Sequence, residues 1–482
     1  MIRRYLFLCL TLATVLLTAC REEQVSTDPT LRLTFSRDTL RFDTVFTTAG
    51  SSTQIVMVYN RNRHAVRIRR VSNSTPYFRL NLDGENDPDR LTNIVLNGGD
   101  SLYLFVRATV GEQHQDVPVY ITDSIVFALN DHEQKLRMEV CGQDVHLIRN
   151  NQRHTRVADY HFTAARPYLI FDTMTITGTT RMDAGATLYM HNGAVLFSMG
   201  DVRAQGSREY PVRLTSDRMD KLFEHVPYRM ASGQWEGWYI HDTASTTIHH
   251  DSLNYVEIRN AHTGLFCQSL QSEHRRQVVL SNSLIHNHAL YGVVLHNTDA
   301  TIWNTQISNC ASYCLFLSGG KHRLTHNTIA SYFGYPYTNV NIHTTGREDV
   351  AAVFLNLLNK DDAPTEVKMY NCIVAGAREN NLVVATPLPE YYTGELAGNY
   401  LVLDTLPYPW CHDNVYAQAE DTVFRNIYYL YKEYQDYDFR LDSVSKARGI
   451  ALPEYTTPYP MDRNGIVRTA PIDAGCYQWQ NH

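Results

Sequence analysis

Three residues near the middle of the chain have the side-chain types of a polysaccharide lyase site: Arg259, His286 and Glu257. A lyase needs a base that removes the proton beside a uronate carboxylate, and an Arg or a cation that neutralises this carboxylate. Arg259 and His286 occupy the same position in successive repeats of a short strand, and equivalent positions on adjacent strands lie about 5 Å apart. We therefore expect Arg259 as the neutralising group, His286 as the base and Glu257 beside them.

A non-catalytic interpretation of the same residues is simpler. The position that Arg259 and His286 share continues as Ser308, Ala330 and Ala375 in later repeats, and these small residues do not outline a groove. The three polar residues would then be solvated side chains on an outer face. Whether the chain is an enzyme stays open, and the non-catalytic interpretation is favoured. If it is an enzyme, we expect a polysaccharide lyase or a glycosidase.

Histidines occur in several other places, and they invite a metal interpretation. The residues concerned are His249, His250, His322, His326 and His343. None of them forms a tight i, i+2 or i, i+4 pattern with a carboxylate as third ligand. We predict no metal site and no cofactor.

Aromatic residues give a stronger signal for ligand binding. Trp235, Trp238, Tyr335 and Tyr337 lie in or beside irregular segments, where flat rings can stack on the faces of sugars. We therefore expect these four residues to bind a ligand. For the two tryptophans an alternative is open, because they lie inside the regular strand pattern GQWEGWYI and could instead cover the core.

The strand that carries the candidate site belongs to a six-residue unit that repeats. It reads YVEIRN from Tyr255, NSLIHN from Asn282, NTQISN from Asn304, HNTIAS from His326 and NCIVAG from Asn371. A period near 22 residues with one short strand per repeat predicts the coils of a right-handed parallel β-helix. The longer interval before Asn371 predicts one coil with an excursion over residues 332–365.

Inward positions follow from the alternation of side chains along a strand. The fourth position is Ile258, Ile285, Ile307, Ile329 or Val374, and positions two and six share its face. Position six is Asn260, Asn287 or Asn309 in the first three complete repeats. Stacked Asn side chains can satisfy the backbone of a buried bend and one another, so we predict a structural ladder. His286 and His288 are then expected to point outward.

The N-terminal third has a different pattern, with short alternating strands between turn signals such as NGGD at residues 97–100. This predicts a β-sandwich of about seven strands. It resembles the Ig-like domains of bacteria in the order TLRFDTVFTTAGSSTQIVMVYNRN from Thr39. We expect a spacer or docking module over residues 31–148 and the β-helix, with its C-terminal cap, over residues 160–478.

The first residues are typical of an export signal, with two Arg followed by an apolar run too short to span a bilayer. The sequence LTAC that ends at Cys20 resembles the bacterial lipobox, in which the cysteine becomes lipidated. We expect residues 1–19 to be a lipoprotein signal peptide, Cys20 the lipidation site and residues 20–30 a linker. The Arg-Glu-Glu that follows resembles the signal that directs lipoproteins of the Bacteroidetes to the outer face of the outer membrane.

Several further motifs resemble the right-handed β-helix lipoproteins of the Bacteroidetes, whose fold is that of pectate lyases. They include GQWEGW from Gly233, NCIVAGAREN from Asn371, and the closing Asp462-Arg-Asn-Gly465 with Arg468 and Asp473-Ala-Gly-Cys-Tyr477. The resemblance implies the fold and export and does not imply a chemistry. The catalytic motifs of pectate lyases and polygalacturonases are missing, so neither activity can be carried over.

Charge and composition limit the partners that the protein can have. The formal net charge is −7, so its surface offers no general attraction for nucleic acid. We predict an all-β protein with an N-terminal Ig-like β-sandwich and a right-handed parallel β-helix, held to a membrane by its lipid anchor. It is expected at the cell surface or on the periplasmic face of the outer membrane, and to bind polysaccharide or envelope proteins without catalysis. A structural or adhesive envelope component is the remaining alternative.

Overall fold

The computed structural model describes residues 25–481, apart from residues 48, 224–225, 243–245, 334–351, 357–363, 386–393, 407, and 428–436. Cys20, Tyr335 and Tyr337 lie outside these residues, as does the predicted signal peptide. The chain divides into two compact units, residues 1–144 and 145–482. Within the described residues, no helix is long and apolar enough to cross a membrane.

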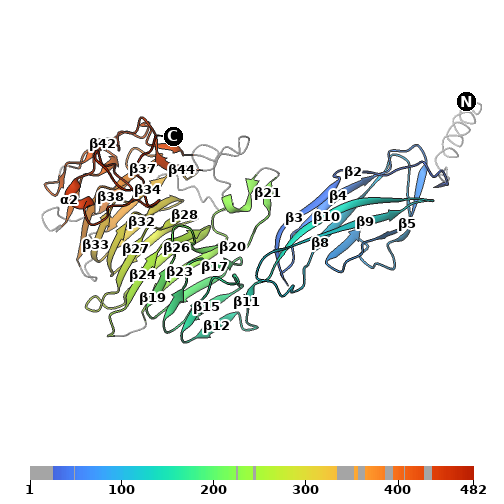
Figure 1. Ribbon diagram of the computed structural model, residues 1–482, viewed down its shortest axis with the longest axis horizontal. Coiled ribbons are helices and arrows are strands. Elements are labelled where there is room, and N and C mark those ends of the chain that lie inside the picture. The colour runs from blue at the N-terminus through green and yellow to red at the C-terminus, as the bar shows by residue number, and fades with distance from the viewer. Residues whose placement is uncertain are drawn as a thin grey trace, which may run out of the picture. The chain divides into compact units, whose positions relative to one another are not determined.

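The first unit is a β-sandwich of two sheets (Figure 1). One sheet contains β1 (Val25–Ser26), β5 (Ala65–Ser72), β9 (Val119–Ala128), β10 (Glu133–Gln143) and β3 (Thr39–Phe46), with β7 (Thr92–Leu96) paired to β5. The other contains β2 (Thr34–Phe35), β4 (Thr53–Tyr59), β8 (Ser101–Ala108) and β6 (Phe78–Leu82). Alternation decides which side chains form the core: Leu104 and Val106 of β8 are fully buried, whereas Tyr103 is 51% exposed. The predicted Ig-like sandwich is confirmed.

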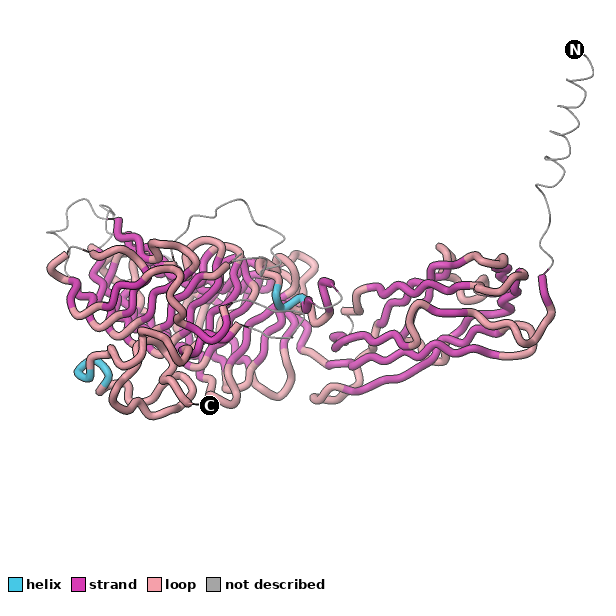
Figure 2. The backbone as a smooth tube through the Cα atoms, turned by 90° about the horizontal axis from the view of Figure 1, so that it is seen from above, coloured by secondary structure: helices cyan, strands magenta, loops and turns pink. Residues whose placement is uncertain are grey.

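The second unit is a parallel β-helix built from three sheets, here named sheets I, II and III (Figure 2). Sheet I contains β11 (His146–Ile148), β14 (Tyr168–Ile170), β17 (Thr187–Met190), β20 (Val212–Ser216), β25 (Val256–Arg259), β28 (Leu284–His288), β31 (Gln306–Cys310), β34 (Thr328–Ser331), β37 (Ile373–Gly376), β40 (Tyr400–Val402) and β42 (Val415–Ala417). Sheet II contains β12 (His154–Val157), β15 (Thr173–Ile176), β18 (Val195–Ser198), β23 (Trp235–His241), β26 (Ala261–Gln268), β29 (Tyr291–His296), β32 (Leu315–Ser318), β35 (Val353–Asn356) and β38 (Leu382–Ala385).

Sheet III contains β13 (Tyr160–Phe162), β16 (Thr180–Met182), β19 (Val202–Gln205), β24 (His250–Asn254), β27 (Gln277–Ser281), β30 (Asp299–Trp303), β33 (Gly320–Thr325), β36 (Thr365–Tyr370), β39 (Glu395–Ala397) and β41 (Cys411–His412). The remaining elements are two short pairs and two helices of three and four residues: β21 (Lys221–Phe223), β22 (Val226–Pro227), η1 (Tyr228–Met230), β43 (Phe424–Asn426), β44 (Asp438–Leu441) and α2 (Pro453–Thr456).

Sheet I carries the six-residue repeat in the predicted register. Ile258 pairs with Ile285, and the column continues through Ile307, Ile329 and Val374. All five side chains are fully buried in one apolar core. The stacked, inward-facing column at position four is therefore confirmed.

The β-helix extends beyond its predicted limits at two points. Strands β11, β12 and β13 pair with the next coil, so the coils begin near residue 146 rather than at residue 160. Strand β35 pairs with β32 in sheet II, although residues 353–356 fall inside the predicted excursion.

Each repeat in the middle of sheet I starts at a sharp bend. Tyr255, Asn282, Asn304, His326 and Asn371, the first residues of the units, all have positive φ angles of 48–55°. Asn260, Asn287 and Asn309 at position six also have positive φ. Asn tolerates this left-handed conformation better than most residues because its short polar side chain can bond to nearby backbone.

A hydrogen-bonded ladder runs along position two, the residue after each first bend. The backbone N–H of one coil donates to the side chain at the same position of the next coil, at distances of 2.8–3.4 Å. The ladder consists of Val256, Ser283, Thr305, Asn327, Cys372, Asn399 and Asn414. It satisfies backbone donors that the bend removes from the regular sheet.

The C-terminal segment, residues 437–481, covers the outer face of sheet I. The backbone N–H of Cys476 donates to the Thr328 hydroxyl at 3.0 Å, and Tyr477 donates to Gln306 at 2.7 Å. A second apolar cluster joins Ala330 and Ala375 to Phe439. The prediction of a solvated outer face is therefore wrong for these repeats: small residues occupy position five because another layer of chain packs there.

Candidate functional site: a polar pocket on sheet I

Two of the three predicted catalytic residues line one pocket between sheet I and the C-terminal segment. Arg259 on β25 and His286 on β28 are register partners on adjacent strands. The pocket has a volume of about 330 Å³. It is lined by Arg259, Leu284, His286, Gln306, Tyr437, Asp438, Phe439, Arg440, Asn464 and Tyr477.

His286 is held in the pocket wall by a chain of hydrogen bonds. Its Nδ1 lies 2.9 Å from the Ser308 hydroxyl, which accepts from the Gln306 amide nitrogen at 2.8 Å. The Tyr477 hydroxyl in turn donates to the Gln306 amide oxygen at 2.7 Å. Ser308 therefore links His286 to Gln306, and Gln306 links both of them to Tyr477.

The electrostatic environment keeps this imidazole neutral. Burial lowers the pKa of His286 well below its usual value, and the Arg259 charge lowers it further. The ring is 6% exposed and lies edge-on to Tyr437, with the ring centroids 5.4 Å apart. A histidine whose pKa is depressed in this way is a weak proton acceptor near neutral pH, so it is better suited to donate a hydrogen bond than to remove a proton.

Glu257 is separated from the other two predicted catalytic residues. Its carboxylate forms ion pairs with Arg213 and Arg463, both at 3.5 Å, and it does not line the pocket. Arg463 comes from the C-terminal segment, more than two hundred residues away in the sequence. Long-range packing therefore assigns Glu257 to a structural ion pair, and the three residues do not form the expected group.

The polar character of the pocket comes mainly from Arg and amide side chains. Arg440 holds Asp438 through both carboxylate oxygens, at 2.8 and 2.5 Å, and its side chain is 46% exposed. Arg259, Gln306 and Asn464 add further donors. Tyr437 provides an aromatic surface beside them. Such a pocket can hold an oxygen-rich ligand through N–H donors and one flat ring.

Trp235 and Trp238 do not reach the protein surface. Both indoles are fully buried in the β-helix core. Trp235 Nε1 donates to the carbonyl of Arg259 at 2.8 Å, and Trp238 Nε1 donates to the Ser198 hydroxyl at 3.0 Å. The expectation that they bind ligand is wrong. A β-bulge between Gly237 and Trp238 shifts the alternation along β23, so both rings point inward.

The Asn residues at position six are buried at bends, as predicted, but they do not bond to one another. The Asn260 amide donates to the carbonyls of Arg229 and Ala231, each at 2.7 Å. Asn287 donates to the Met230 carbonyl at 3.0 Å. Asn309 accepts from the backbone N–H of Tyr332 at 3.0 Å. The Asn side chains at position six therefore form hydrogen bonds with the backbone of neighbouring segments, and the stacked ladder lies at position two instead.

His288 faces the interior rather than the solvent. It is fully buried, and its Nδ1 accepts from the backbone N–H of Ala261 at 3.2 Å. Burial lowers its pKa to about 3. The bend at Asn287 reverses the alternation that predicted an outward side chain, and this removes His288 from the candidate site.

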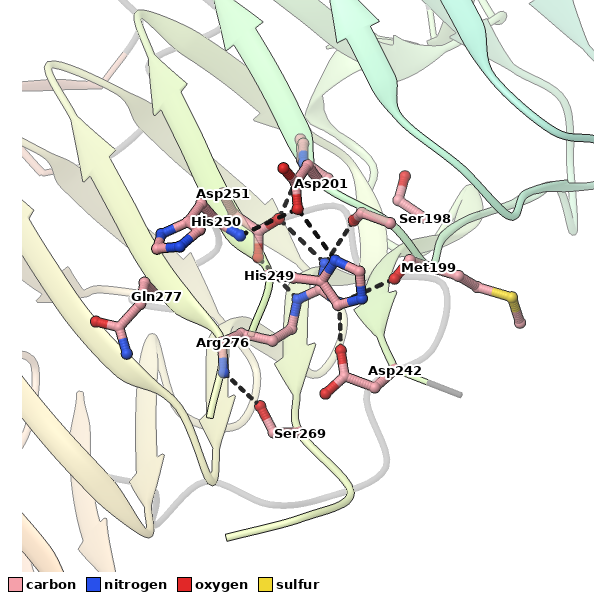
Figure 3. A network of polar contacts seen from close by, with 12 residues as sticks. Ser198, Met199, Asp201, Asp242, His249, His250, Asp251, Ser269, Arg276 and Gln277 are labelled. Atoms are coloured by element: carbon pink, nitrogen blue, oxygen red, sulfur yellow. Dashed lines mark hydrogen bonds and ion pairs between the residues drawn. The ribbon is translucent and has the colours of Figure 1, made fainter. Parts of the chain in front are cut away.

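A buried charge network near the corner between sheets II and III was not predicted (Figure 3). Arg276 is fully buried, pairs with Asp251 at 2.8 Å and also bonds to Asp242. Burial raises the pKa of both carboxyl groups, and the Arg276 charge opposes this rise. His249 bonds to Asp201 beside it at 3.0 Å. The three buried charges face one another, so the network is structural.

No arrangement suited to a metal ion occurs in the part of the chain that the structure describes: no group of three or more His, Cys, Asp or Glu side chains converges there. His343 lies outside the described residues. His322 is buried and bonds to the Gly319 carbonyl at 3.0 Å, and His326 is buried against Thr456.

Comparisons with known proteins leave the family open. No protein-family model matches the chain, and no curated protein matches it. One similar solved structure is that of a family 123 glycoside hydrolase from Clostridium perfringens, described for glycolipid glycan hydrolysis, with 8% identity and a TM-score of 0.19. The match covers 26% of this chain and 26% of that chain.

A second is the ASH/PapD-like domain 7 of human CEP192, with 10% identity and a TM-score of 0.17, over 26% of this chain and 94% of that domain. At these scores neither structure bears on the function.

Proposed function

We propose that the protein is a non-catalytic binding module of the bacterial cell envelope, exported and anchored by lipid at Cys20, whose sheet I pocket holds a glycan residue. The main support is the pocket itself, in which Arg259, Gln306 and Asn464 surround a neutral His286 and the Tyr437 ring. Its volume of about 330 Å³ falls at the lower end of the range of about 300–1,000 Å³ seen for small-molecule sites.

Binding is favoured over turnover by the state of the histidine. A lyase base must accept a proton, but burial and Arg259 depress the pKa of His286. Its Nδ1 is also engaged by Ser308. A neutral imidazole has one N–H donor and one ring-nitrogen acceptor, so it can form hydrogen bonds with the hydroxyl groups of a sugar. Glu257 is paired with two arginines and supplies no second carboxylate for glycoside hydrolysis.

The proposal is tested by screening the full chain on a glycan array and measuring the affinity of any hit by calorimetry. Arg259→Ala should weaken binding by about tenfold to a hundredfold, because a charge-assisted hydrogen bond contributes about 1.5–3 kcal/mol. Arg213→Ala is the matched control, since Arg213 lies on the adjacent strand β20 and does not line the pocket. A panel without any hit, or equal losses in both variants, would contradict the proposal.

One observation supports a second candidate, a uronate lyase: Arg259 and His286 do share the pocket. The test is the release of unsaturated products from a range of uronate polymers, followed by ultraviolet absorbance. Product formation that disappears in His286→Ala would establish the lyase and replace the binding proposal. A structural or adhesive role would instead be indicated by envelope proteins recovered in pull-downs together with an empty glycan array.

A further inference from the structure

The Ig-like unit contains a cleft of about 920 Å³ that is unrelated to the β-helix pocket. It lies at the β6 edge of the sandwich and takes side chains from both sheets, through β5 on one side and β4, β6 and β8 on the other. Three of its lining residues are arginines, namely Arg70, Arg79 and Arg107, and none is Asp or Glu. The side chains that line the cleft are therefore positively charged, although the protein as a whole has a formal net charge of −7.

Two of these arginines lie directly opposite each other. Arg79 on β6 and Arg107 on β8 are cross-strand register partners, and both are exposed. Like charges directly opposite on neighbouring strands destabilise a sheet. Within the described residues, no carboxylate forms an ion pair with Arg70, Arg79 or Arg107, whereas Arg41 and Arg137 of the same unit both pair with Glu139. In the described part of the chain, the three cleft arginines therefore have no acidic ion-pair partner.

The rest of the cleft combines polar and apolar groups. Hydroxyl and amide side chains are contributed by Thr53, Ser72, Asn73, Thr75, Asn81 and Asn86. Apolar surface comes from Phe105, Pro76 and Pro88. A sugar ring has hydroxyl groups at its rim and C–H groups on its faces, so it needs both kinds of contact. Arginine adds planar, paired donors that match a carboxylate or a sulfate group.

We propose that this cleft is a binding site for an acidic saccharide, in which Arg79 and Arg107 hold a carboxylate or sulfate group and Arg70 a second one. The ligand supplies the negative charge that the cleft lacks, and its ring lies over the apolar surface. The Ig-like unit thus acts as a second recognition site, and the sandwich is more than a spacer. This inference is independent of the function proposed for the sheet I pocket.

Affinity electrophoresis of the full chain tests the proposal, with gels that contain polygalacturonate, dextran sulfate, neutral dextran or polyphosphate. We expect retardation by at least one acidic polysaccharide and none by dextran, and we expect the retardation to decrease as salt is raised. The Arg79→Gln/Arg107→Gln double variant should lose the retardation. A double variant with the same charge change outside the cleft, Arg63→Gln/Arg67→Gln, should keep it.

A second measurement separates binding from folding. Because Arg79 and Arg107 repel each other, Arg79→Gln/Arg107→Gln should melt at the same temperature as the wild type or higher, although it no longer binds. Saturating acidic polysaccharide should raise the melting temperature of the wild type and leave that of the double variant unchanged.

Four results would overturn the inference: no retardation by either acidic polysaccharide, retardation by polyphosphate alone, equal retardation of both double variants, or a loss explained by unfolding of the cleft variant. Arg259→Ala distinguishes the two sites. If Arg259→Ala abolishes retardation while Arg79→Gln/Arg107→Gln does not, the acidic ligand belongs to the sheet I pocket and the cleft proposal fails. If Arg79→Gln/Arg107→Gln loses the retardation while Arg259→Ala keeps it, the acidic ligand binds in the cleft. The glycan array then remains the test of the sheet I pocket.

Discussion

Replacement of Asn327 by Leu tests whether the position-two ladder holds the coils together. The Asn327 amide oxygen accepts from the backbone N–H of Thr305 at 3.0 Å, and its amide nitrogen donates to the Ile302 carbonyl at 2.9 Å. Asn327 is fully buried. Leu has nearly the same shape but offers neither a donor nor an acceptor, so both backbone groups lose a partner in a site that water does not reach.

The expected loss of stability follows from these two groups. A buried polar group left unsatisfied costs about 1–3 kcal/mol, so the pair costs about 2–6 kcal/mol. Burial of the more apolar Leu side chain returns about 1–2 kcal/mol of this. We therefore expect Asn327→Leu to lower the free energy of unfolding by about 2.5 kcal/mol, the middle of a range of about 0–5 kcal/mol. Asn380→Leu is the control, because Asn380 is exposed and its change should stay within about 0.5 kcal/mol.

Urea unfolding followed by tryptophan fluorescence measures this difference, since Trp235 and Trp238 are both buried in the same core. Hydrogen exchange adds a local readout: the Thr305 amide should exchange markedly faster in Asn327→Leu than in the wild type, because it has lost its acceptor. If Asn327→Leu unfolds at the same urea concentration as Asn380→Leu, or if the Thr305 amide keeps its protection, the ladder is not a stabilising element and our reasoning is refuted.

Three further predictions concern buried polar groups. Asn309→Leu should lower the melting temperature, because it removes the acceptor of the Tyr332 N–H and places a bulky residue at a φ of 54°; an unchanged melting temperature would contradict the anchoring role. The pKa of His288 is about 3 when folded, against 6.5 when unfolded. The unfolded state therefore binds more protons below pH 6.5, and stability is lost as the pH falls through that window. The stability advantage of the wild type over His288→Gln should shrink by about 1.4 kcal/mol per pH unit below 6.5; a constant difference in urea titrations from pH 7 to pH 5 would show that His288 is not buried as a neutral ring. Arg276→Leu should destabilise the β-helix by about 3–5 kcal/mol, because Asp251 and Asp242 lose their buried counter-charge; thermal unfolding close to that of the wild type would exclude this role.

The coil architecture could be predicted from sequence because it is a local, repeated pattern. Every repeat places an apolar residue at position four of a short strand, and the period near 22 residues brings Ile258, Ile285 and Ile307 into one column. The ladder at position two was hidden, because Ser, Thr, Asn and Cys share its role without sharing a side-chain type. A run of Asn at position six was more visible in the sequence, although those residues bond to other segments.

The candidate site could be predicted only in part, because contacts distant in sequence complete it. Arg259 and His286 were found from their shared position in the repeat. Tyr437, Arg440 and Tyr477, which close the pocket, come from a segment more than 150 residues further along the chain. The small residues Ala330 and Ala375 at position five were the available signal that a layer of chain covers this face. No feature of the sequence indicated that Glu257 would form an ion pair with Arg463 instead of lining the pocket.

The central claim is that the sheet I pocket binds a glycan and does not convert it. Its most direct test is a single incubation of the full chain with the best ligand from the glycan array, in which bound ligand and released product are measured together for wild type, Arg259→Ala and His286→Ala. We predict saturable binding that is weakened in both variants, and no product in any of the three samples. Product that forms with the wild type and disappears with His286→Ala would contradict the claim and identify a catalytic site.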